Sequence, residues 1–274
     1  MPGLEDVNGM RGSSGSRGSQ ASRRARVRIG QLEVDPVTFE EALERIGELV
    51  RRRRGGAVFT PNVDHVVQAE RSVPFREAYG RAALTLADGM PLLWAARLLG
   101  SPLPEKVSGS DLVVPLARRA AERGWRVYLL GGEPSVAGEA AGRLARELGV
   151  AIVGTDSPIV HADGDADDAA GVLERVRAAR PDLILVALGA PKQELWIDRF
   201  AGDLAPAVAV GVGAGLDFVA GQKRRAPRWM SRIGLEWLFR LAQEPRRMWR
   251  RYLIDDPAFV AIVARTRHRA GQSS

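Results

Sequence analysis

Short apolar runs alternate with longer segments of helical period from Val27 to about Gly221. This alternation is typical of β-α units, in which parallel strands form a sheet and the helices cover its faces. The runs Leu183 to Leu188 and Val208 to Val212 contain no polar side chain, so they suit central strands buried on both faces. The sequence therefore predicts an α/β, Rossmann-like fold with a mostly parallel sheet flanked by helices.

Local signals predict where several elements begin and end. Thr38 precedes a segment of helical period, and Glu41 lies three residues after Thr38, which is the pattern of a capping box at a helix start. A helix is therefore expected over residues 37–54. Further strands are predicted at 57–60, 84–86, 126–130 and 150–154, and further helices from about 62 and over 111–123, 135–148 and 167–180.

The pattern changes after Gly221, where no strand-like run remains. Pro227, Pro245 and Pro257 each stand where a helix can begin, so three short helices are expected. Each should have an apolar side and a cationic side, because apolar residues and arginines both recur at helical spacing. The first residues are mainly Gly, Ser and Arg and cannot offset the entropy of ordering. The predicted divisions are a disordered tail (1–26), a Rossmann-like core (27–221) and a basic helical appendage (222–274).

Positive charge is concentrated in the first and last segments of the chain. The net charge is +7 overall, of which residues 1–28 contribute +4 and residues 221–274 contribute +9, so the residues between them carry −6. An acidic body with a strongly basic final segment favours contact of that segment with a polyanion. Lipid headgroups, nucleic acid and phosphorylated substrates all fit this description.

Several classes of protein are excluded by what the sequence lacks. It contains no Cys, which removes thiolate zinc sites and cysteine nucleophiles, and its three His lack ligand-like spacing, so no metal is expected. No apolar run of signal-peptide type follows the basic start, and no window holds the roughly 18 apolar residues of a membrane span. The sequence predicts a protein that does not cross a membrane by itself.

The predicted strands end in polar or Gly-rich loops, and in open α/β sheets ligands bind at the carboxyl ends of the strands. Glycine there lets backbone amides approach an anion, so Gly131, Gly132 and Gly213 are candidate substrate-binding residues. Any one such loop is more often structural, but five together favour a ligand that carries phosphate. The five loops are Thr60 to Asn62, Ala87 to Gly89, Gly131 to Glu133, Gly189 to Gln193 and Gly211 to Gly215.

Asp88 is the sharpest candidate for acid/base chemistry. It directly follows a short apolar strand and precedes Gly89 and a helix rich in Leu and Trp, so partial desolvation could raise its pKa into the range useful to a base. The structural alternative is that Asp88 caps the helix that begins near Met90. Composition and spacing leave these two interpretations equal.

Three other signals have a structural interpretation that is stronger than the functional one. The acidic run Asp163 to Asp168 could hold a divalent ion, but negative charge also stabilises a helix start there. Ser108 to Asp111 fits a turn and N-cap better than a nucleophile, because no His is placed nearby in sequence. Gly211 to Gly215 is like a dinucleotide loop, yet no ribose-binding acid follows it at the usual distance.

Taken together, seven motifs in order resemble the WecB/TagA/CpsF family of bacterial glycosyltransferases over about residues 28–255. They are TPNVDH (60–65), LADGMPLLWAARLLG (86–100), VSGSDL (107–112), YLLGG (128–132), LGAPKQELWI (188–197), VGVGAGLDFVAG (210–221) and RAPRWMSRIGLEWLFRLAQEPRRMWRRYL (225–253).

The resemblance implies an inverting, metal-independent transfer of a hexose from a UDP-sugar to a hydroxyl of a sugar on a polyprenyl diphosphate. The hexose is of the N-acetylmannosamine, uronic acid or glucose type, and the products are bacterial cell-surface polysaccharides or teichoic acids. No cofactor is implied. The chemistry suits these residue types, because displacement at an anomeric carbon needs a base for the acceptor proton and cations for the departing UDP.

The matching motifs also imply roles for individual residues. Asp88 corresponds to the proposed general base, Thr60 and Asn62 line the same pocket, and Gln193 supplies an amide on its far wall. The appendage arginines that contact the leaving diphosphate correspond to Arg240, Arg247 and Arg250. The position before VSGSD, commonly Arg in the family, is Lys106 here, which keeps the charge but loses the planar two-pronged contact with phosphate.

A lipid-borne acceptor suits the basic appendage, which carries Trp229, Trp237 and Trp249 among its arginines. Trp favours membrane interfaces, and each Lys or Arg near an anionic bilayer contributes about 1 kcal/mol. We therefore expect a cytoplasmic protein bound peripherally to the inner face of the cell membrane. The oligomeric state stays open, with a homo-oligomer among the alternatives.

Two other functions remain as alternatives. An NAD(P)-dependent Rossmann oxidoreductase would use the loop from Gly211 to Gly215, and a nucleic-acid-binding protein would use the basic appendage. The second is disfavoured because the appendage places its aromatic residues with Leu and Ile at core-like spacing rather than beside a phosphate-tracking groove. No nucleic-acid partner is expected.

Overall fold

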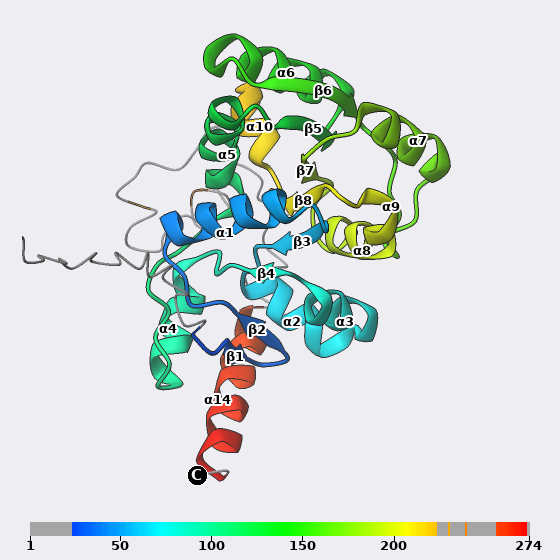
Figure 1. Cartoon of the computed structure of the whole chain (residues 1–274). Helices are drawn as coiled ribbons and strands as arrows, with labels where there is room; N and C mark the ends of the chain where they lie inside the picture. The colour runs from blue at the N-terminus through cyan, green and yellow to red at the C-terminus, as the bar shows by residue number, and fades with distance from the viewer. Residues whose placement is uncertain (1–23, 224–229, 231–238, 240–255, 273–274) are drawn as a thin grey trace, which may run out of the picture.

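A computed structural model of the chain describes residues 24–223, 230, 239 and 256–272. Its centre is a six-stranded sheet with strand order β4-β3-β8-β7-β5-β6, in which every neighbouring pair is parallel (Figure 1). The α/β, Rossmann-like prediction is confirmed. The strands are β3 (Gly56–Phe59), β4 (Leu84–Thr85), β5 (Arg126–Gly131), β6 (Ala151–Asp156), β7 (Leu183–Ala187) and β8 (Val208–Gly211).

Helices cover both faces of the sheet, and two buried apolar clusters fill the space between the layers. On one face lie α1 (Phe39–Arg52), α5 (Gly109–Arg123), α6 (Pro134–Leu148) and α10 (Gly215–Ala220). On the other lie α2 (Val63–Arg71), α3 (Val73–Arg81), α7 (Ala169–Ala179), α8 (Lys192–Arg199) and α9 (Ala201–Leu204). A further helix, α4 (Met90–Leu98), follows β4. Among the helices described, none is long and apolar enough to cross a membrane.

Two predicted helix starts are confirmed by their hydrogen bonds. The Thr38 hydroxyl accepts from the Glu41 amide at 3.2 Å, and the Glu41 carboxylate accepts from the Thr38 amide at 2.8 Å, which completes the capping box of α1. The acidic run ends at Asp168, which is the N-cap of α7 and accepts from the Gly171 amide at 3.2 Å. Within the described part of the chain, no group of three or more His, Asp or Glu is placed to hold a metal ion.

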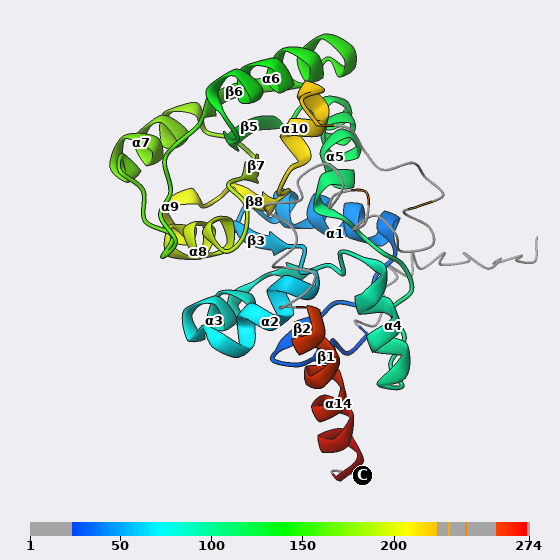
Figure 2. The same cartoon turned by 180° about the vertical axis from the view of Figure 1, so that it is seen from behind.

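A hairpin that the sequence did not predict and a helix near the end of the described residues close one end of the molecule. Strands β1 (Val27–Ile29) and β2 (Leu32–Val34) pair antiparallel, and α14 (Asp256–Gln272) packs on β1 and α2 (Figures 1 and 2). The Gly30 amide donates to the Thr266 hydroxyl at 3.1 Å. The helix predicted at Pro257 is therefore confirmed, and those predicted at Pro227 and Pro245 lie outside the described residues.

The divisions into a tail (1–26) and an appendage (222–274) stay predictions. The described residues begin at Arg24, which donates to the Pro36 carbonyl at 3.3 Å. On α14, Phe259, Ile262 and Val263 are buried against the body of the protein. The last part of the predicted appendage thus contributes its apolar side to the core.

Asp35, just after β2, fastens the hairpin to β4. Its carboxylate accepts from the buried Thr85 amide at 2.9 Å and pairs with Arg26 at 3.2 Å and Arg45 at 3.4 Å, while its own amide donates to the Thr85 carbonyl at 2.8 Å. The carboxylate is only 2% exposed, so its partners replace its hydration.

We expect Asp35→Ala to lower the free energy of unfolding by about 1–3 kcal/mol, because it leaves the buried Thr85 amide without its acceptor. Urea denaturation measures this change. The matched control is Glu33→Ala, which removes an exposed carboxylate two residues away and should stay within about 0.5 kcal/mol of the parent. Equal effects of the two variants would contradict the anchoring role of Asp35.

Candidate functional site

The polar loops predicted at the strand ends lie along one edge of the sheet, because all six strands are parallel. Strands β3 and β8 are neighbours in the sheet, and their chains leave this edge in opposite directions. The chain after β3 enters α2 on one face, whereas the chain after β8 enters α10 on the other. In open α/β sheets ligands bind where neighbouring strands diverge in this way, and we refer to the region between the loops after β3 and β8 as the crevice.

Thr60 stands in this crevice and ties β3 to β8. Its hydroxyl is buried and donates to the Gly211 carbonyl at 3.3 Å. The first residue of α5, Gly109, lies against the same two groups, since a Cβ there would come within 2.7 Å of both the Gly211 carbonyl oxygen and the Thr60 hydroxyl. Glycine at 109 therefore lets the start of α5 close the crevice from one side.

Gln193 lies on the other side, on the first turn of α8. Its side chain is buried, with Oε1 accepting from the Gly213 amide at 3.2 Å and Nε2 donating to Glu194 at 2.7 Å. Gln193 and Gly213, predicted as site residues on separate motifs, are thus brought into direct contact. The Gly213 amide is used in this bond within the protein.

Asn62 is the N-cap of α2 and follows Thr60 by two residues. Its Oδ1 accepts from the Asp64 amide at 3.1 Å and lies 2.8 Å from His65 Nδ1. The predicted helix start near residue 62 is confirmed, and the same side chain that begins the helix is partly exposed at the crevice.

Asp88 is held at the crevice by contacts from three directions. Its amide donates to the Pro61 carbonyl at 2.8 Å, and the Val107 amide donates to the Ala87 carbonyl at 2.8 Å. The Ser108 hydroxyl donates to Asp88 Oδ2 at 3.1 Å. These bonds set the half-buried carboxylate between the loop after β3 and the start of α5.

Asp88 does not cap helix α4, so the structural alternative for this residue is wrong. Gly89, not Asp88, is the N-cap of α4, and its backbone has φ 113° and ψ 146°, a conformation that favours glycine. The N-cap predicted within Ser108 to Asp111 is confirmed and is Ser108, since α5 begins at Gly109 rather than at Asp111, but the Ser108 hydroxyl does not cap the helix and bonds to Asp88 instead. The sequence reasoning missed this bond because it joins two separate motifs.

Gly131 and Gly132 lie further along the same edge, at the end of β5. A Cβ at Gly131 would come within 2.6 Å of the Ala187 carbonyl, and the Gly132 amide donates to that carbonyl at 3.0 Å. These glycines therefore permit close approach to β7. Their predicted role toward a substrate stays a prediction.

The remaining predicted residues are cationic. Lys106 is half-buried and precedes Ser108 by two residues, in the loop that leads into α5. Arg240, Arg247 and Arg250 lie outside the described residues. Of the predicted set, the structure brings Asp88, Thr60, Asn62, Gln193 and Gly213 to one crevice, with Lys106 in an adjoining loop.

These features define a Rossmann-like α/β protein with polar side chains gathered at the carboxyl edge of its sheet. The sequence matches the model of the Glycosyl transferase WecG/TagA/CpsF family over residues 27–273. The chain belongs to this family, and its fold and site stand within the matched range.

Two curated relatives carry the same name, N-acetylglucosaminyldiphosphoundecaprenol N-acetyl-beta-D-mannosaminyltransferase. The protein from Bacillus spizizenii (strain ATCC 23059 / NRRL B-14472 / W23) is 32% identical over 213 residues, which cover 77% of this chain and 80% of the relative. The protein from Bacillus subtilis (strain 168) is 28% identical over 217 residues, which cover 79% and 81% of the two chains. This chain is thus similar to glycosyltransferases that, by name, act on a sugar diphosphate carried by undecaprenol.

Proposed function

We propose that the protein is an inverting glycosyltransferase that moves a hexose from a UDP-sugar to a hydroxyl of a polyprenyl-diphosphate-linked sugar. The observation that carries the proposal is the half-buried Asp88 carboxylate, fixed by Ser108 beside a crevice that also holds Thr60, Asn62 and Gln193. The names of the relatives support the acceptor class. The products would be bacterial cell-surface polysaccharide or teichoic acid.

In this reaction the acceptor hydroxyl oxygen forms a bond to the anomeric carbon while the bond from that carbon to UDP breaks. The proton of the hydroxyl passes to Asp88, and the bonding electron pair leaves with UDP. A single displacement from the far side inverts the configuration at the anomeric carbon. Ser108 donates to one oxygen of Asp88 and so orients the carboxylate that receives the proton.

The leaving UDP gains negative charge as its bond to the sugar breaks, and fixed cations lower the energy of that state. We assign this role to Arg240, Arg247 and Arg250, with Lys106 as a further cation near the start of α5. Guanidinium groups bind phosphate oxygens through two parallel N–H donors, so they can supply the charge that a divalent ion supplies in other enzymes. No cofactor is needed in this scheme.

The lipid acceptor calls for contact with a membrane, and an apolar groove between α4 and α14 is the surface we assign to it. The groove has a volume of about 830 Å³, and its lining includes Trp94, Leu98 and Val260, which are 53%, 53% and 69% exposed. Arg267 also lines it and adds positive charge. Since α4 begins two residues after Asp88, the groove starts close to the reacting groups, and the protein would work at the inner membrane face.

The proposed reaction is tested by incubating the protein with a panel of UDP-sugars and a short-chain prenyl-diphosphate sugar, with products read by mass spectrometry. One donor should yield a product heavier by one hexose-type residue, and UDP should raise the melting temperature because it binds the folded state. A melting temperature raised by NAD and not by UDP would instead favour the oxidoreductase.

The membrane contact has its own expected result. Replacing Trp94, Leu98 and Val260 together by Ser should weaken binding to anionic phospholipid vesicles tenfold or more, because burial of such side chains contributes about 1.5–3 kcal/mol each. Sedimentation with vesicles measures the affinity. The control is Ile159→Ser, which removes a side chain that is 69% exposed elsewhere on the molecule and should leave the affinity unchanged. An equal loss in both proteins would overturn the assignment.

A further inference from the structure

A chain of four polar side chains runs beneath the crevice and joins two of its walls. Gln193 Nε2 donates to Glu194 Oε1 at 2.7 Å, and that same carboxylate oxygen lies 3.4 Å from His65 Nε2. On the far side of the imidazole ring, His65 Nδ1 lies 2.8 Å from Asn62 Oδ1. Both ends of the chain, Gln193 and Asn62, are amides of the proposed substrate site.

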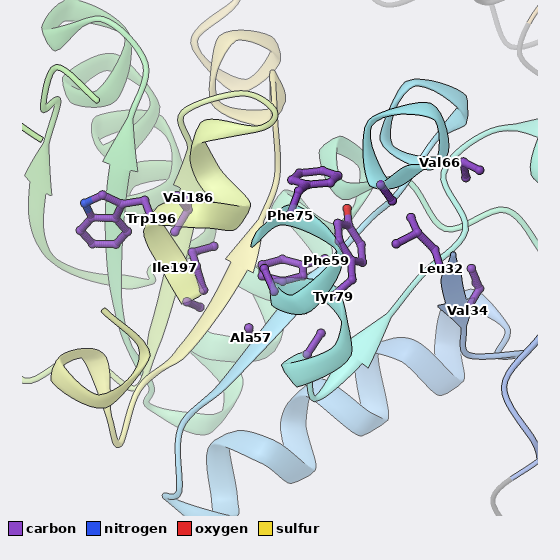
Figure 3. Close-up of a cluster of buried hydrophobic side chains, with 14 of the residues drawn as sticks. Leu32, Val34, Ala57, Phe59, Val66, Phe75, Tyr79, Val186, Trp196 and Ile197 are labelled. Atoms are coloured by element: carbon purple, nitrogen blue, oxygen red, sulfur yellow. The ribbon is translucent and has the colours of Figure 1, made fainter. Parts of the chain in front are cut away.

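The middle of this chain is buried among apolar and aromatic groups. Glu194 is 0% exposed and His65 is 5% exposed. The His65 ring lies 5.9 Å from the ring of Phe75 and 6.4 Å from that of Tyr79, measured between centroids. Phe75 and Tyr79 belong to the cluster shown in Figure 3. A carboxylate in such surroundings is unfavourable unless a partner compensates its charge.

Carboxylates act on the hydroxyl of Tyr79, which lies beside the pair of Glu194 and His65. The pKa of the Tyr79 hydroxyl is raised well above its ordinary value, first by burial and then by the negative charges of Glu194, Asp64 and Asp88. His65 Nε2 faces the Glu194 carboxylate, and Nδ1 lies between Asn62 Oδ1 at 2.8 Å and the Asn62 backbone amide, which donates to it at 3.3 Å.

A buried ion pair is weak evidence for stability, because well-packed apolar residues are often as stabilising in its place. What this pair does specify is orientation. The amide of Gln193 has two nearly equal-sized ends, and Glu194 accepts only from the nitrogen end while the Gly213 amide donates only to the oxygen end. Asn62 Oδ1 lies between the Asp64 amide, which donates to it, and His65 Nδ1, so His65 is one of the two groups that hold this end of Asn62.

We propose that Glu194 is a positioning residue for the transfer reaction. It sets the amide orientation of Gln193 directly and supports the position of Asn62 through His65, so that one buried carboxylate contributes to two walls of the crevice. The inference rests on the proposed function for the substrate that these amides meet. The orientation itself is a property of the protein and can be observed without any reaction.

The test is a double-mutant cycle on the full chain. Glu194→Gln keeps the size of the side chain but gives it an amide, which fits either orientation of Gln193 and removes the carboxylate that lies against His65. We expect this change to raise the KM for the UDP-sugar about tenfold, the scale of one lost hydrogen bond. In a background that already carries Gln193→Ala and Asn62→Ala, the same change should alter KM less than about twofold.

The matched control is Trp196→Phe, on the same helix two residues later. It also removes a fully buried polar group, but on the side of α8 that packs against Phe200, so it should lower the melting temperature and leave KM unchanged. If Glu194→Gln raises KM equally in both backgrounds, or Trp196→Phe raises it as much, Glu194 has only a structural role. Should Glu194→Gln fail to fold, the cycle is run with His65→Gln against Asn62→Ala and judged by the same criteria.

A measurement without substrate separates this inference from the proposed function. The side-chain amide protons of Gln193 should give resolved, slowly exchanging NMR signals in the parent protein and lose them in Glu194→Gln. Unchanged signals would overturn the positioning role even if sugar transfer is found. Changed signals in a protein that transfers no sugar would retain the orientation and reject the reaction.

Discussion

Asp88→Asn is expected to lower the rate of sugar transfer at least about a hundredfold, the lower end of what a positioned general base contributes. The amide has the same shape and still accepts from Ser108, but it cannot take the proton of the acceptor hydroxyl. Binding of UDP should persist, because the change leaves Thr60, Gln193 and the proposed cations in place. Single-turnover transfer and UDP affinity, measured on the same preparation, give the two quantities.

A second variant separates the loss of a base from the loss of a negative charge. Asp64→Asn removes a carboxylate from the first turn of α2, which, like Asp88, contributes to the field at Tyr79. Its transfer rate should stay within a few-fold of the parent. A comparable fall in both variants would assign the effect to the field of the site, and near-normal transfer by Asp88→Asn would remove Asp88 from the mechanism.

Arg240→Ala, Arg247→Ala and Arg250→Ala are each expected to lower the transfer rate about a hundredfold or more, the effect of removing one group that stabilises charge in the transition state. The loss should appear mainly in kcat, since the charge on the departing UDP develops during the reaction. Replacement by Lys should recover part of the rate, because the charge returns without the two-pronged contact. Steady-state kinetics with the donor identified by the product assay provide the measurement.

The control for these variants is Arg269→Ala, which removes a cation from α14. Its rate should match the parent. Point variants are preferable to a deletion of everything after Gly221. The basic, Trp-containing pattern of that segment suggests such a deletion as a joint test of membrane binding and activity. That deletion would also remove Phe259, Ile262 and Val263 from the core, so a loss of activity would report unfolding as well as chemistry. Normal rates in all three arginine variants would reject the proposed role of the appendage.

The sheet and the position of the site could be predicted from the sequence because both depend on short-range patterns. The apolar runs around residues 183–188 and 208–212 became β7 and β8, the two strands beside the middle of the sheet. Since parallel strands end at one edge, loops such as Thr60 to Asn62 and Ala87 to Gly89 were expected together there. The contact between Asp88 and the loop after β3 confirms that expectation.

What could not be predicted depends on contacts between distant segments. Glu194 follows a site residue in a helix and is like any charged helix residue in sequence, and only its enclosure against His65 distinguishes it. The hairpin of β1 and β2 consists of three-residue strands, too short for a periodic signal. The use of the Gly132 and Gly213 amides inside the protein likewise depends on which segments become neighbours.

The packing of α14 on β1 joins segments that are 236 residues apart at the bond between Gly30 and Thr266. A ribosome that has made the hairpin and all six sheet strands has not yet made the segment that packs on β1 and α2. Nascent chains would therefore present this apolar surface until α14 has been made. Chaperones that recognise exposed apolar surface would have their longest access to this end of the protein.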